Sequence, residues 1–251
     1  MIVLNEYIEF ISHFIEQKRG DGTPVIEYIV PSSEIASEIR PLPGNTLLLK
    51  NDTAVELGHP TGISTFFALC GDESTRVENG KITLIGKDLD ELIGTEVPLG
   101  IVIIARFKST PSVGLYSKLL GCGYVGGEVP GFLVRAMSGR YWCRVSWKAV
   151  KSGLTLFTLG SYIIKKIKIN IPDAESASLL FITSSDKDVL ELSRIGEHVE
   201  KAIHHARRES FMELYPDEYR CLTNQQCSIC QDEKTCSEIR KIFRLSREVG
   251  E

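Results

Sequence analysis

The stretch "LGIVIIARF", residues 99–107, decides the fold because its apolar run is long enough to form a central strand of a sheet. Shorter runs with strand composition lie on both sides of it along the chain. The Asn79-Gly80 pair predicts a hairpin turn that leads into the strand starting at Lys81. The other expected strands are "VIEYIV" (25–30), "TLLLK" (46–50), "GISTFFALC" (62–70), "KITLIG" (81–86), "RYWCRVSW" (140–147) and "ASLLFITS" (177–184).

Helical periodicity marks segments before, within and after this strand-rich region. Apolar residues at helical spacing predict helices over 4–18, 159–169 and 185–214, and a short helix should end near Gly121. Strands and helices mix without a regular alternation, which predicts an α+β fold with a mixed, largely antiparallel sheet and flanking helices. We expect residues 1–208 to form this body and 209–251 to form a small C-terminal Cys-rich module.

Bulk composition excludes several classes of protein. The chain has 251 residues, of which 43% are hydrophobic and 25% charged, as in ordinary globular proteins. A net charge of −4 gives no reason to expect nucleic acid as a partner. No segment has the roughly 20 apolar residues of a membrane helix, and the N-terminus lacks the basic region of a signal peptide. We therefore expect a cytoplasmic protein with no membrane partner.

Four of the seven cysteines lie within "CLTNQQCSICQDEKTC", residues 221–236, at the spacing Cys-x5-Cys-x2-Cys-x5-Cys. In a reducing compartment such a cluster predicts metal binding rather than disulfides. Four thiolates suit either a zinc ion or an iron–sulfur cube. Zinc ribbons pair two Cys-x2-Cys knuckles, and this stretch has one, so iron–sulfur is favoured and zinc stays the alternative. The predicted metal ligands are Cys221, Cys227, Cys230 and Cys236.

Three further stretches resemble the β subunit of the CO dehydrogenase/acetyl-CoA synthase family. They are "VENGKITLIGKDLDEL" followed by "PLGIVI" (77–103), "RYWCRVSWKAVKSGLTLFTLGSYIIKKIK" (140–168) and "SLLFITSSDKDVLELSRI" (178–195). Their order, and their distance from the cysteines, resemble that family's central domain and the start of its metal-cluster domain. The resemblance covers roughly residues 45–236.

The resemblance implies a [4Fe–4S] cluster at the four cysteines, because that family holds such a cube there. The family bridges its cube to a nickel pair, where a methyl group, CO and CoA become acetyl-CoA. This chain has no Cys-Gly-Cys motif to complete a nickel site, and its cysteine intervals are shorter. The sequence ends fifteen residues after Cys236, so we expect the family's C-terminal domain to be absent.

These departures lead us to expect electron transfer, or interaction with a CO dehydrogenase or corrinoid iron–sulfur protein partner, in anaerobic one-carbon metabolism. The isolated chain is not expected to catalyse the synthase reaction. One alternative is a zinc-stapled assembly or interaction module. Another is a diverged CoA-binding acyl-transfer enzyme.

The Trp-x-Arg-x-Ser segment of the resemblance suggests a surface for CoA. An indole can stack on adenine, and guanidinium groups can hold phosphates through paired hydrogen bonds. The alternative is a core tryptophan with surface arginines on a strand. The candidate CoA-binding residues are Trp142, Arg144, Arg140 and Arg135. Cys70, Cys122 and Cys143 lie in apolar stretches, and we expect them to be small buried residues.

Overall fold

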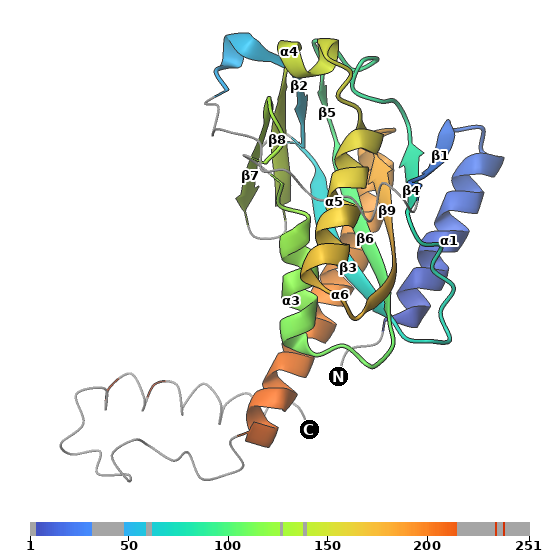
Figure 1. The fold of residues 1–251 in the computed structure, drawn as a ribbon, viewed down its shortest axis with the longest axis vertical. Helices are drawn as coiled ribbons and strands as arrows, with labels where there is room; N and C mark the ends of the chain where they lie inside the picture. Colours follow the sequence, from blue (N-terminus) through green and yellow to red (C-terminus); the bar gives the residue numbers. More distant parts are fainter. Residues whose placement is uncertain are drawn as a thin grey trace. The chain divides into compact units, whose positions relative to one another are not determined.

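The computed structural model describes residues 4–31, 48–58, 62–125, 128–137 and 140–214, together with Lys234 and Glu238 (Figure 1). Contacts divide the chain into two compact units, Met1–Ala206 and Arg207–Glu251. The first unit contains both sheets and nearly all of the described residues. Its architecture is α+β with mixed sheets, as the sequence predicts.

The larger sheet has five strands in the order β1, β4, β9, β6, β3. β6 (Leu99–Phe107) is antiparallel to β9 (Ala174–Ile182) and parallel to β3 (Ser64–Gly71). β4 (Lys81–Ile85) is parallel to β9 and antiparallel to β1 (Val25–Ile29). The prediction that residues 99–107 form an internal strand is confirmed, and eight of its nine residues are buried.

A second, four-stranded sheet has the order β5 (Glu96–Val97), β2 (Thr53–Leu57), β8 (Arg140–Ser146), β7 (Phe132–Met137). The expected strand at 46–50 is wrong over its described residues, since Lys50–Asp52 form a turn of 3-10 helix. The strand itself begins at Thr53, and its other four residues, 54–57, are buried. Leucine content misled the prediction, because apolar residues alone do not separate a strand from the segment before it.

The predicted hairpin at Asn79-Gly80 is also wrong, because β3 and β4 are not neighbours in the sheet. The turn itself exists, with Gly80 at a φ of 82°. It packs against β9: Gly80 N donates to Ala177 O at 2.8 Å, and Ala177 N donates to Asn79 Oδ1 at 3.2 Å. A two-residue hairpin requires strands on both sides of the turn, whereas residues 72–80 all separate β3 from β4.

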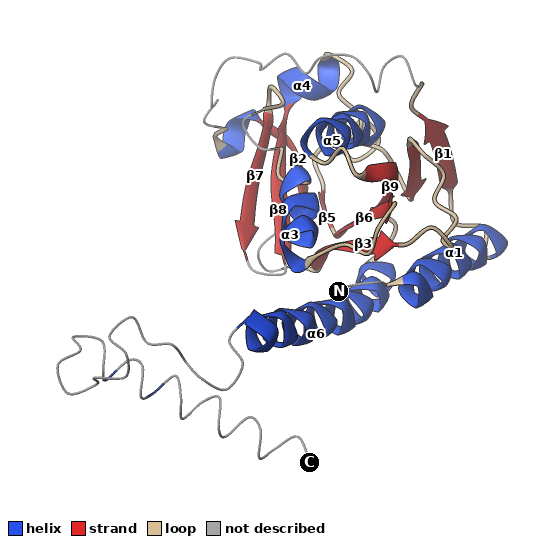
Figure 2. Ribbon diagram, turned by 60° about the horizontal axis from the view of Figure 1, so that its bottom comes forward, coloured by secondary structure: helices blue, strands red, loops and turns tan. Residues whose placement is uncertain are grey.

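Helices cover both faces of the larger sheet (Figure 2). α1 (Asn5–Gly20) and α6 (Asp186–Leu214) lie on one face, and α5 (Leu156–Asn170) lies on the other. α3 (Val113–Cys122) packs against α5 and β3, and the short α4 (Trp147–Lys151) follows β8 directly. Buried positions recur along α6 at helical spacing, namely Val189, Leu192, Ile195, Val199 and Ile203.

The N-terminus of the long helix α6 is capped by a side chain. The Ser185 side chain accepts a hydrogen bond from the backbone N–H of Asp188 at 3.2 Å, which satisfies one of the free donors of the first turn. Asp186 and Asp188 add negative charge at the positive end of the helix dipole. The sequence prediction of a capped helix over 185–214 is confirmed. Within the described part of the chain, no helix combines the length and apolarity needed to cross a membrane.

Candidate functional site

The four predicted metal ligands, Cys221, Cys227, Cys230 and Cys236, lie outside the described residues. The body contains the other three cysteines, and all three are buried and free. Burial raises the pKa of the Cys70 thiol to about 12, and it also raises the pKa of Cys122 and of Cys143. The body thiols therefore stay protonated at neutral pH, whereas metal ligation requires thiolates.

No group of three or more His, Cys, Asp or Glu side chains is arranged to hold a metal ion among the residues that the structure describes. The other four cysteines of the sequence lie within residues 221–236, and their role as metal ligands stays a prediction. The set of four sulfur donors fits either a cube or a zinc ion chemically.

Trp142 and Arg144 lie side by side on β8, as the predicted CoA surface requires. Strand alternation buries Tyr141, Cys143 and Val145 in the core, and it turns Trp142 and Arg144 to the opposite face of the smaller sheet. The Arg144 guanidinium carbon lies 4.8 Å from the centre of the Trp142 ring, which is a cation–π arrangement. Both side chains are partly exposed.

Glu56, on the neighbouring strand β2, holds this pair together. It is directly opposite Arg144 in the antiparallel ladder, and it is 6% exposed. Its Oε1 atom accepts a hydrogen bond from Arg144 Nε at 2.8 Å and another from Trp142 Nε1 at 3.0 Å. Glu56 therefore fixes the indole and the guanidinium in one orientation and compensates the charge of Arg144.

Sequence reasoning missed Glu56, although a signal for it exists. "TAVEL" (53–57) is the strand β2 that the prediction placed too early, and an acidic residue in a buried strand needs a partner.

For the other two arginines of the predicted surface, the strand pairing gives the backbone position. Arg135 on β7 is opposite Trp142 in the ladder, and Arg140 pairs with Met137 at the far end of β8. Whether these arginines bind CoA stays a prediction.

A cavity of about 710 Å³ lies where β8 runs into α4. Trp147 and Lys148 line it, with Ser146, Thr158 and Tyr162 as further polar groups. Gly131 shapes its wall: it has a φ of 73°, and a Cβ atom built there would come within 2.3 Å of Ser146 Oγ. This contact accounts for the glycine, since Gly131 O also accepts the Ser146 backbone N–H at 2.8 Å.

A comparison with protein-family models finds no match. Among curated proteins, the chain is 28% identical over 232 residues to the acetyl-CoA decarbonylase/synthase complex subunit beta of Archaeoglobus fulgidus. The aligned region covers 86% of this chain and 41% of that protein, so the chain spans about two fifths of its relative's length. This match confirms the resemblance that the motifs predict, and it marks the chain as a divergent relative.

Proposed function

We propose that this divergent relative of the acetyl-CoA synthase β subunit is an iron–sulfur protein that binds one [4Fe–4S] cluster through Cys221, Cys227, Cys230 and Cys236. The observation that carries the proposal is the separation of the seven cysteines into two kinds. Three are buried in the body with raised pKa values, and four are gathered within sixteen residues of sequence. A cluster of four thiolates is the donor set that a cube requires.

The proposed role of the cluster is electron transfer or association with a protein partner. The relative is named as a subunit of a complex, which supports a protein partner for this chain. We propose a CO dehydrogenase or a corrinoid iron–sulfur protein as that partner, in one-carbon metabolism. The absence of a Cys-Gly-Cys sequence argues against the complete synthase reaction by this chain alone.

Metal analysis of the full chain tests the cluster. Purification under anaerobic conditions, followed by reconstitution with iron and sulfide, should give a brown protein with about four iron atoms per chain. The Cys227→Ser variant should lose the visible absorption and most of the iron, while the far-UV circular dichroism of the body stays unchanged. Cys122→Ala is the matched control, because it removes a buried body thiol and should leave the iron content unchanged.

Zinc is the alternative that this experiment separates from iron–sulfur. A colourless protein that retains one zinc ion per chain after the same reconstitution would overturn the iron–sulfur proposal. It would support a zinc-stapled assembly module, in which metal binding and folding of the C-terminal segment are coupled. In that case Cys227→Ser should abolish zinc binding and unfold the C-terminal segment, with no change in the visible spectrum.

A second candidate function is CoA binding, which two observations on β8 favour. The Trp142 indole is fixed by Glu56 and partly exposed, and the cavity at the end of the same strand contains Trp147 and Lys148. An exposed aromatic face and a cation suit an adenine ring and a phosphate. Titration calorimetry with CoA should show binding that Trp142→Leu weakens. No heat at millimolar CoA would remove this candidate.

A further inference from the structure

β1 (Val25–Ile29) is an edge strand of the larger sheet, and β4 is its neighbour on one side (Figure 1). Three large apolar side chains gather on it: Ile26, Tyr28 and Ile29 are 44%, 40% and 54% exposed. Nine such side chains are exposed in the described part of the chain, so a third of them lie on this short strand. A single exposed apolar residue needs no explanation, whereas a cluster on a strand edge indicates an interaction site.

The backbone of β1 is open on the side away from β4. Gly86 N donates to Pro24 O at 2.9 Å, and Val30 N donates to Gly80 O at 2.9 Å, which gives the phase of the β1–β4 ladder. The backbone groups at even positions from 24 to 30 therefore face β4. The N–H and C=O groups at positions 25, 27 and 29 point to the other side, where no further strand lies among the residues that the structure describes.

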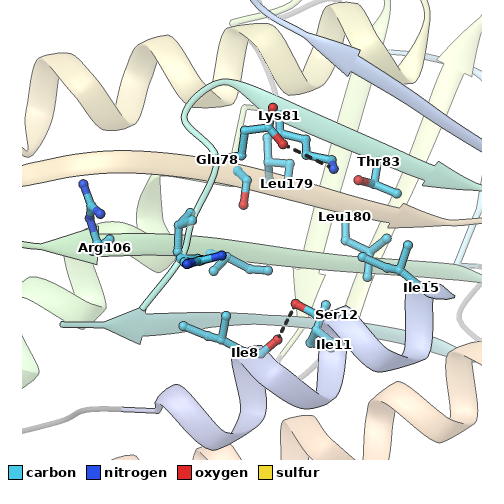
Figure 3. Close-up of a pocket in the computed structure, with 14 residues that line it drawn as sticks. Ile8, Ile11, Ser12, Ile15, Glu78, Lys81, Thr83, Arg106, Leu179 and Leu180 are labelled. Atoms are coloured by element: carbon cyan, nitrogen blue, oxygen red, sulfur yellow. Dashed lines mark hydrogen bonds and ion pairs between the residues drawn. The ribbon is translucent and has the colours of Figure 1, made fainter. Parts of the chain in front are cut away.

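The features that usually block an open edge are not present in β1. The strand contains no lysine and no proline, and its pairs with β4 show no register shift. Its one charged residue, Glu27, is already paired, because Oε1 lies 3.1 Å from Arg19 Nη2 and 2.9 Å from Lys81 Nζ. Figure 3 shows the second ion pair of Lys81, with Glu78 at 3.4 Å. An incoming strand would therefore meet a paired carboxylate rather than a free one.

The two faces of β1 differ in chemistry. The Tyr28 ring lies 5.9 Å from the Phe157 ring of α5, so Ile26 and Tyr28 are on the α5 face of the sheet. Glu27 is on the α1 face, where Arg19 reaches it. A strand that pairs with β1 must therefore present apolar residues at alternate positions on the α5 face. β1 of a second copy does so, because a two-fold axis perpendicular to the sheet reverses the strand and keeps each face.

Charge and exposure select the register of such a pair. An axis at Glu27 would put two carboxylates directly opposite each other, which is unfavourable. An axis at Ile26 would leave Ile29, the most exposed of the three apolar residues, beyond the paired strands. An axis at Tyr28 pairs the two tyrosines with each other and sets Glu27 opposite Ile29 of the second copy. The open N–H and C=O groups at positions 27 and 29 then form four hydrogen bonds between the copies, two for each hydrogen-bonded pair.

We propose that two copies of this chain pair antiparallel through β1, about a two-fold axis at Tyr28, so that their larger sheets become continuous. A second copy fits this edge because β1 supplies the alternation, the free backbone groups and the paired carboxylate that the edge itself requires. Assembly stops at a dimer, since all residues of β3, the strand at the other edge of the larger sheet, are buried. The surface goes beyond the proposed cluster and does not depend on it.

Analytical ultracentrifugation of the full chain over a concentration series tests the dimer. Ile29→Pro removes one free-edge N–H from each copy and no bond to β4, so it should raise the dissociation constant roughly tenfold to hundredfold. Ile29→Thr is the matched control, because it changes the same side chain but keeps the N–H, and it should dissociate like the unmodified protein. A monomer at every concentration, or equal dissociation constants for the two variants, would overturn the proposal.

Cysteine substitutions test the register without a proline in the strand. Tyr28→Cys should form an intermolecular disulfide on mild oxidation, since Cα atoms of a non-hydrogen-bonded pair are about 4.5 Å apart and a disulfide spans about 4.4–6.8 Å. Glu27→Cys is the control, because its Cα atoms would be diagonal neighbours about 7–8 Å apart. The unmodified protein gives the background from its seven cysteines. Cross-linking that is no faster for Tyr28→Cys than for Glu27→Cys would overturn the proposed pairing.

Discussion

The buried ion pair between Lys18 on α1 and Asp188 on α6 allows a quantitative test of how the two helices are held on the sheet. Lys18 Nζ lies 2.6 Å from Asp188 Oδ1, and the two side chains are 8% and 9% exposed. Asp188 Oδ2 also accepts the Ser184 hydroxyl at 2.6 Å, and Lys18 Nζ lies 4.9 Å from the centre of the Phe14 ring. The pair therefore lies in a largely desolvated and well-bonded setting.

Removing one partner should destabilise the protein far more than removing both. Lys18→Met leaves a buried carboxylate, and Asp188→Leu leaves a buried ammonium, so each should lower the free energy of unfolding by about 3–5 kcal/mol. The double variant leaves no unpaired charge. Its remaining losses are the Ser184 hydrogen bond and the acidic residue at the start of α6, so it should lie only about 1–2 kcal/mol below the unmodified protein.

Urea unfolding of the four proteins, followed by far-UV circular dichroism, measures the double-mutant cycle. We expect similar m-values and a coupling free energy of about 3 kcal/mol or more between Lys18 and Asp188. If the losses of the two single variants add up to the loss of the double variant, the pair is not coupled. Burial then does not couple the two charges.

The pH dependence of the same proteins gives an independent check. Burial by itself would raise the pKa of Asp188, but the hydrogen bonds from Lys18, Ser184 and Ser185 outweigh it, and the net pKa is lowered. A lowered pKa in the folded state stabilises the protein above the unfolded value of about 3.9, and this contribution is lost as the pH falls through the folded value. The unmodified protein should therefore lose its advantage over the double variant on acidification below about pH 4.

Two further predictions concern the smaller sheet and its turns. Glu56→Gln keeps an acceptor for Trp142 and Arg144 but removes the charge, so urea unfolding should show a loss of about 1–3 kcal/mol; an unchanged midpoint would contradict the role of Glu56. Gly58→Ala should be more destabilising than Gly94→Ala in thermal unfolding. Both glycines have positive φ, which costs about 1–2 kcal/mol for alanine, but only at position 58 would the added Cβ meet a backbone oxygen at 2.3 Å. Equal losses would refute the steric part of this reasoning.

Local patterns in the sequence predicted most of the elements but not their partners. The apolar run of β6 and the periodicity of α6 gave nearly correct bounds, because burial on both faces of a strand, or on one face of a helix, leaves a direct pattern of side chains. Pairing leaves no such pattern. The Asn79-Gly80 turn therefore suggested a hairpin, although β4 pairs with β1 and β9.

The candidate sites also combine local features, which the sequence predicts, with long-range contacts, which it does not. The sequence by itself determined where four of the seven cysteines gather, and it placed Trp142 and Arg144 on one expected strand, since spacing and strand composition are local properties. Only the tertiary structure brought Glu56 under that pair and Lys81 beside Glu27, because these contacts join segments far apart in the chain. An open strand edge is visible only after folding, when the pairing of each strand is known.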